Sequence, residues 1–124
     1  AKEREIINLV VSQVNECAYC LAAHTALGKM NGFSDEQILE LRTGEASFDP
    51  KFDALAKFVK DITINRSKPS AESLDNLLAA GYSRENLVDI IVVIGDKIIS
   101  NFIHGATDVP VDFPAAPALE EVAA

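Results

Sequence analysis

Residues 5–25 read EIINLVVSQVNECAYCLAAHT, and this segment decides the expected fold. Ahead of the cysteines, aliphatic residues recur at the spacing of an amphipathic helix, which predicts a helix over Lys2–Val14. One stripe of that helix is formed by Ile6, Leu9, Val10 and Gln13. Asn15 suits the end of this helix or the start of the next. A second helix is expected from about Cys17 to Met30, so the segment predicts two helices joined by a short connection.

Start and stop signals indicate four further helices. Ser34 and Gln37 have the spacing of a capping box and open a short helix that ends near Gly44. Asp49 followed by Pro50 opens another, because proline is favoured at the first helical position. The last three helices are expected at residues 50–65, 71–80 and 84–104. No segment alternates apolar and polar residues with period two, so we predict an all-α fold of about six helices.

The last expected helix, Arg84–His104, is apolar nearly all round. Such a helix must be covered on most sides, and a chain of 124 residues offers little cover of its own. We therefore expect a homo-oligomer with this helix near the contacts. Pro110 and Pro114 exclude a helix beyond Gly105, and residues 107–124 are expected to form an extended C-terminal tail.

Length and charge restrict the classes of function. The chain has 124 residues and suits a single domain over residues 1–124. A net charge of −8 repels phosphate backbones and anionic lipids, so neither nucleic acid nor a membrane is expected as a partner. The N-terminus lacks a secretory signal, which predicts a cytoplasmic protein. Because helical sequence begins directly at Ala1, we expect further helical residues ahead of it.

The chemistry is expected in the second helix, which contains both cysteines of the chain. Cys17 and Cys20 are three residues apart, and His24 follows Cys20 by four, so all three share one stripe of a helix. One sulfur to attack, a second to resolve and an imidazole to take the proton are the groups that thiol catalysis needs. A helix N-terminus also favours the thiolate.

Two alternatives use the same residues without redox chemistry. Buried cysteines often act as small apolar residues in a core. Zinc is the other alternative, because a tetrahedral site needs four ligands, and Cys17, Cys20, His24 and the distant His104 supply that number. Such a site would use every cysteine and histidine in the chain. A non-enzymatic helical oligomer therefore stays open beside an enzyme.

Residues 5–25 resemble the core of the alkyl hydroperoxidase D family, within the carboxymuconolactone decarboxylase superfamily. The redox branch of that family is marked by a glutamate, eleven residues, C-x-x-C, three residues and a histidine. This pattern is matched here by Glu5, Cys17, Cys20 and His24. Weaker similarity continues through Gly32–Ser34 and over Asn101–Pro114, so the resemblance extends over most of the chain.

The resemblance implies a peroxidase or disulfide reductase without a cofactor or metal. Cys20 would be oxidised by a hydroperoxide, Cys17 would close the disulfide, His24 would be the base and Glu5 would orient it. Twelve residues span about 18 Å along a straight helix, so the chain must bend near Asn15 to bring Glu5 to His24. The implied partners are a hydroperoxide and an external dithiol of the lipoyl or thioredoxin type, and the implied assembly is a trimer or hexamer.

Three residues near the motif need a separate interpretation. Family members often have glycine where this chain has Glu16, whose carboxylate would oppose thiolate formation if it pointed inward. Tyr19 replaces a histidine found inside the C-x-x-C of some members and either hydrogen-bonds in the site or lines its pocket. His104 is expected to interact with the last carbonyls of its helix. Lactone decarboxylation, the other chemistry of the superfamily, does not need a cysteine pair, which counts against it here.

Overall fold

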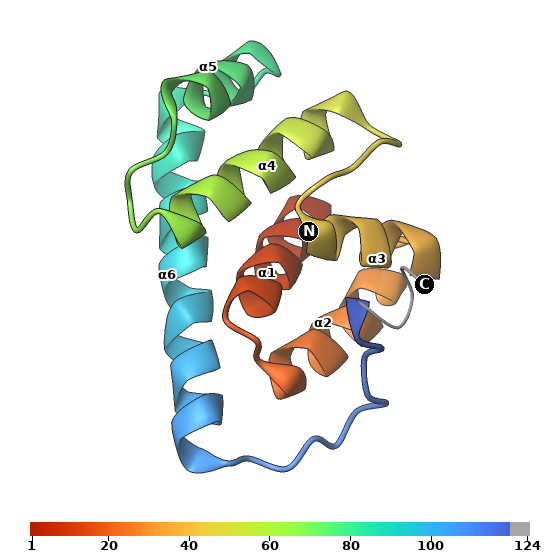
Figure 1. Ribbon diagram of the computed structural model, residues 1–124. Coiled ribbons are helices and arrows are strands. Elements are labelled where there is room, and N and C mark those ends of the chain that lie inside the picture. Colours follow the sequence, from red (N-terminus) through yellow and green to blue (C-terminus); the bar gives the residue numbers. More distant parts are fainter. Residues whose placement is uncertain (120–124) are drawn as a thin grey trace.

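The computed structural model describes residues 1–119, and within them it contains six helices and no strand. The helices are α1 (Lys2–Val14), α2 (Ala18–Met30), α3 (Asp35–Thr43), α4 (Pro50–Ile64), α5 (Ala71–Ala79) and α6 (Arg84–Thr107). The predicted all-α fold of about six helices is confirmed. The first helix lies in the middle of the molecule and α6 runs along one side of it (Figure 1).

The core is built around α1, which contacts α2, α3, α4 and α6. Ile6, Leu9 and Val11 of this helix are fully buried. Full burial of one such side chain contributes roughly 1.5–3 kcal/mol relative to exposure. The aliphatic stripe identified in the sequence is therefore the surface on which four other helices pack.

The helix starts are set by the expected side-chain caps. Ser34 and Ser83 each accept from the backbone N–H three residues on, and both capping boxes are complete. Asp49 caps α4 ahead of Pro50. The third helix ends at Gly44, whose φ of 91° lies in the left-handed region that favours glycine. The starts of these helices and the end of α3 lie within about two residues of the positions predicted from these local signals.

The chain reverses between α1 and α2, and the bend expected near Asn15 is confirmed. Glu16 takes a left-handed conformation with φ of 54°, and the N–H of Cys17 donates to the carbonyl of Ser12 at 3.0 Å. Cys17 was expected as the first helical residue and is instead the N-cap of α2. Its extended backbone lets the sulfur accept from the N–H of Cys20, which is the function of a capping side chain.

The last helix is longer than predicted and ends at Thr107, with Asp108 as a left-handed C-cap. Gly105 does not terminate it, because an isolated glycine costs only about 1 kcal/mol inside a helix. Pro110 sets the limit, since it disfavours helical backbone at Val109 and has no N–H to donate. His104 therefore lies in the last turn of α6.

The two faces of α6 differ from a simple amphipathic pattern. In its second half the inward positions include the buried polar residues Lys97 and Asn101, whereas apolar residues face outward. The exposed apolar residues of α6 are Val88, Ile91, Val92, Ile99, Phe102 and Ile103.

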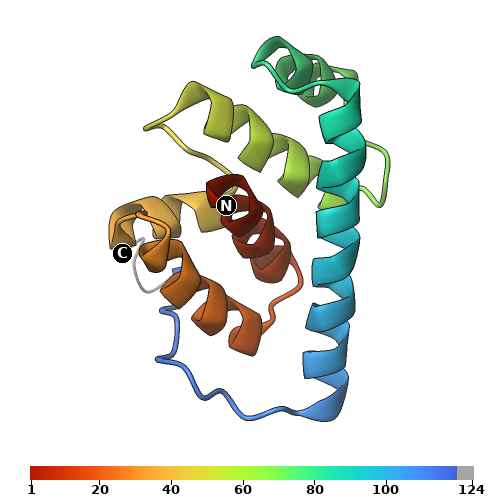
Figure 2. The same ribbon diagram turned by 180° about the vertical axis from the view of Figure 1, so that it is seen from behind.

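Beyond α6 the chain has an extended course and returns along α2 toward α3 (Figure 2). In residues 1–119, no helix has the length and apolar composition needed to cross a bilayer.

Candidate redox site

The two cysteines form a disulfide, Cys17–Cys20, with their Cα atoms 5.3 Å apart. The N–H of Cys20 donates to the sulfur of Cys17 at 3.3 Å, so that sulfur lies at the N-terminus of α2. Both residues are buried, with Cys17 exposed by 7% and Cys20 by 2%. A pocket of about 250 Å³ opens at Cys17 and is lined also by Tyr19 and His104. Cys17 is therefore the cysteine that lines this pocket.

Glu5 and His24 meet in the interior, across the interface of α1 and α2. The Nδ1 atom of His24 lies 2.7 Å from Oε2 of Glu5, and both side chains are buried. A carboxylate accepts hydrogen bonds, so Nδ1 carries the proton and Nε2 keeps its lone pair. The glutamate thus fixes the tautomer that leaves Nε2 as a proton acceptor.

His104 is the imidazole that directly contacts the disulfide, and the sequence interpretation did not place it there. Its Nδ1 atom lies 3.7 Å from Sγ of Cys20 and 2.7 Å from the carbonyl oxygen of Ser100. Because a carbonyl only accepts, Nδ1 is the protonated nitrogen of a neutral His104. The expected interaction with the last carbonyls of the helix is not what the structure shows, because Ser100 lies a full turn before them. The same N–H also faces the sulfur as a donor.

A signal for His104 existed in the sequence. Lys97, Asn101 and His104 recur at i, i+4 and i+7 in the second half of α6, and all three face inward. Asn101 donates to Ser12 at 3.2 Å and accepts from Asn15 at 3.0 Å, which ties α6 to the bend beside the cysteines. Burial lowers the pKa of Lys97, while the charges of Asp96 and Glu5 act in the opposite direction.

Tyr19 packs on the same histidine. The rings of Tyr19 and His104 are stacked with centroids 4.3 Å apart, and Phe113 of the tail meets Tyr19 edge-on at 5.8 Å. A hydrogen bond to the Asp112 carboxylate, together with burial and the charge of Asp112, raises the pKa of Tyr19. Of the two interpretations of Tyr19, the structure supports the second, because the residue lines the pocket.

Glu16 is exposed and lines the pocket that opens at Cys17. The four side chains considered as zinc ligands do not all come together. Among residues 1–119, Cys17, Cys20 and His104 form the one group of three whose ligand atoms lie within 4.8 Å of one another, and His24 is not part of it. His24 instead bonds Glu5.

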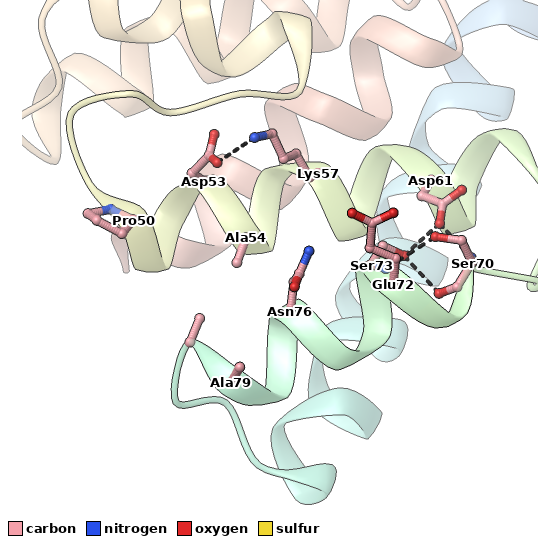
Figure 3. Close-up of a pocket in the computed structure, with 11 residues that line it drawn as sticks. Pro50, Asp53, Ala54, Lys57, Asp61, Ser70, Glu72, Ser73, Asn76 and Ala79 are labelled. Atoms are coloured by element: carbon pink, nitrogen blue, oxygen red, sulfur yellow. Dashed lines mark hydrogen bonds and ion pairs between the residues drawn. The ribbon is translucent and has the colours of Figure 1, made fainter.

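Another pocket, with a volume of about 500 Å³, lies between α4 and α5 (Figure 3). Three of its charged side chains have partners: Lys57 bonds Asp53 at 2.6 Å, and Asp61 accepts from Ser70 and Ser73. No cysteine or histidine lines it. Size alone does not make this pocket the reactive one.

The structure thus combines an all-α fold with a C-x-x-C disulfide at the start of α2. The profile of the Carboxymuconolactone decarboxylase family matches residues 1–61. The uncharacterized protein YdfG of Bacillus subtilis (strain 168) is 31% identical over 93 residues, which are 73% of this chain and 63% of YdfG. The present chain thus spans less than two thirds of that relative. Residues 1–61 of this chain are thus similar to the carboxymuconolactone decarboxylase family.

Two solved structures share the fold. One is a protein of unknown function from Agrobacterium tumefaciens, described as a candidate antioxidant defence protein AhpD. Its TM-score is 0.80 at 23% identity, over 90% of this chain and 78% of that chain. The other, an uncharacterized peroxidase-related protein from Silicibacter sp. TM1040, has a TM-score of 0.75 at 24% identity, over 93% and 59% of the two chains. Both are similarities of fold.

Proposed function

We propose that this protein is a cysteine-based peroxidase and thiol–disulfide oxidoreductase that reduces hydroperoxides through Cys17 and Cys20. The observation that carries the proposal is a disulfide whose Cys20 sulfur lies 3.7 Å from an imidazole N–H, with a buried Glu5–His24 pair one helical turn further along α2. A peroxidatic thiol needs a stabilised thiolate and a proton acceptor.

The proposed oxidation proceeds in two steps. The Cys20 thiolate attacks the terminal peroxide oxygen, so that an S–O bond forms, the O–O bond breaks and the alkoxide takes a proton to become an alcohol. Cys17 then attacks the sulfenic acid on Cys20, which forms the S–S bond and releases water. His24, with Nε2 free, removes the thiol proton, and the His104 N–H stabilises the anionic sulfur of Cys20.

The proposed reduction uses an external dithiol of the lipoyl or thioredoxin type. Cys17 lines the pocket, so the incoming thiolate attacks this sulfur and forms a mixed disulfide. Cys20 leaves as the thiolate, which the His104 N–H again stabilises. The second thiol of the partner then releases Cys17 and carries away the oxidised disulfide. A pair that must be reduced in every cycle suits the cytoplasm, where thiols are kept reduced.

The other candidate functions receive less support. Lactone decarboxylation gives no role to the cysteine pair. A closed zinc site needs four ligands, and the group around the cysteines supplies three.

We expect reduced protein to lose both of its thiols when it is treated with one equivalent of an organic hydroperoxide. The chain has two cysteines, and their Cα atoms already lie at disulfide distance. Thiols are counted before and after the addition, and metal is analysed in the same sample. Retention of both thiols, or stoichiometric zinc that protects them, would contradict the peroxidase.

We also propose that the protein is a homo-oligomer, a trimer or hexamer, with the outward face of α6 in the contact. Phe102 is exposed by 64% and lies among other exposed aliphatic residues of the same helix. Contiguous apolar surface of this kind is typical of an interface. We expect light scattering to give a mass of about three or six times 13.4 kDa, and Phe102→Glu to lower it. A monomer at micromolar concentration would refute this arrangement.

A further inference from the structure

A buried arginine lies beside the redox site without a counter-charge. Arg42, at the end of α3, is 4% exposed. Its Nε donates to Oε1 of Gln13 at 2.9 Å, whereas Nη1 is buried and has no hydrogen-bond partner. Within the part of the chain that the structure describes, no carboxylate forms an ion pair with it. Burial lowers the pKa of Arg42, yet guanidinium stays charged at neutral pH.

A pocket of about 290 Å³ opens at this guanidinium. Arg42, Gln13 and Glu16 form its polar end. The rest of the lining is apolar and comes from α2 and from the returning C-terminal segment: Ala18, Leu21, Val111, Ala115, Ala116, Pro117, Ala118 and Leu119. The pocket thus combines an apolar lining with one buried cation, Arg42, and one exposed carboxylate, Glu16.

An uncompensated buried charge is costly, and its usual compensation is an opposite charge with matching hydrogen bonds. Arginine suits a carboxylate in particular, because its planar fork donates two parallel bonds. We infer that this pocket binds the carboxylate of an organic acid whose apolar body lies against the C-terminal segment.

The position of the pocket places a bound acid beside the redox site. Glu16, Ala18 and Val111 line both this pocket and the one that opens at Cys17. An acid held at Arg42 therefore lies next to the disulfide. If the proposed peroxidase activity holds, organic hydroperoxides that carry a carboxylate are the preferred substrates. Binding itself does not depend on that activity.

The test measures binding of octanoate by titration calorimetry, with octanol as the uncharged comparison. We expect saturable binding of one octanoate per chain, at least about tenfold tighter than octanol, since a hydrogen bond to a charged group has about this effect. In Arg42→Met the preference for octanoate should vanish. Arg84→Met, which removes an exposed arginine at the start of α6, should bind like wild type.

Two further variants test the carboxylate site independently of Arg42→Met. Glu16→Gln removes the carboxylate that shares the polar end, so it should tighten octanoate binding, and this variant tests the site even if Arg42→Met does not fold. Glu120 and Glu121 follow Leu119 in the sequence. Binding that appears only after both are changed to glutamine identifies the chain itself as the source of the carboxylate. Equal binding of octanoate and octanol in wild type and in all these variants overturns the inference.

The same variants separate this inference from the proposed function. Reduction of cumene hydroperoxide, which has no carboxylate, is measured in wild type and in the control variant Arg84→Met, and both proteins should reduce it equally. If neither protein reduces it but wild type binds octanoate, the peroxidase proposal fails and the carboxylate site stands. If both proteins reduce it and neither binds octanoate, the carboxylate site fails and the peroxidase proposal stands.

Discussion

Cys20→Ser is expected to abolish hydroperoxide reduction, with a loss of about a thousandfold or more, whereas Cys17→Ser should complete a single turnover. A serine hydroxyl at position 20 cannot form the anionic nucleophile. In Cys17→Ser the nucleophile remains, but no sulfur is left to resolve its oxidised form. A sulfenic acid should therefore accumulate on Cys20.

The measurement is trapping of the sulfenic acid with a dione reagent, followed by mass spectrometry of the cysteine-containing peptide. Each single variant controls for the other, because both remove the disulfide. The structure makes the comparison informative: the Cys17 sulfur caps a helix, whereas the Cys20 sulfur contacts His104. A trapped species only on Cys17, in Cys20→Ser, would reverse the two roles. No trapped species in either variant would end the peroxidase proposal.

His24→Ala is expected to reduce the rate of peroxide reduction by about 100-fold, the usual effect of losing a general base. Glu5→Gln should act in the same direction but less strongly. The Glu5 carboxylate accepts from Nδ1 at 2.7 Å, and an amide at this position would accept that bond without the negative charge. The rate is measured with a small neutral hydroperoxide under single-turnover conditions, so that re-reduction does not limit it.

The pH dependence of alkylation reports how the thiolate is stabilised. In reduced wild type, alkylation of Cys20 should reach half its maximal rate below the ~8.5 of an unperturbed thiol. His24→Ala and His104→Phe should both raise this midpoint, the second by about one pH unit, because it removes a hydrogen-bond donor to a charged sulfur. Phenylalanine keeps a ring against Tyr19, so packing is preserved.

These variants also separate the enzyme from its alternatives. A zinc site predicts that His104→Phe releases metal and lowers the melting temperature, with no titrating thiol. Cysteines that only pack predict slow alkylation that neither histidine affects. A midpoint near that of free cysteine, together with turnover that is indifferent to His24, would exclude the proposed activation.

The helices and their order were largely determined by local sequence. Capping boxes at Ser34 and Ser83, Pro50 at a first helical position and Gly44 in the left-handed region act within a few residues of chain. Such interactions satisfy backbone groups at a helix end wherever that helix lies. The family spacing added one long-range contact, Glu5 to His24, which composition and periodicity alone do not specify.

Tertiary structure decided which side chains surround the sulfurs. His104 reaches Cys20 from 84 residues away because α6 continues past Gly105 and Asn101 holds it against the bend. The pocket at Arg42 exists because the C-terminal segment returns over α2. Local sequence records where a helix starts and which face is apolar, since those depend on neighbours along the chain. The partner of a buried polar group depends on how distant helices pack, and the sequence of one helix does not contain that information.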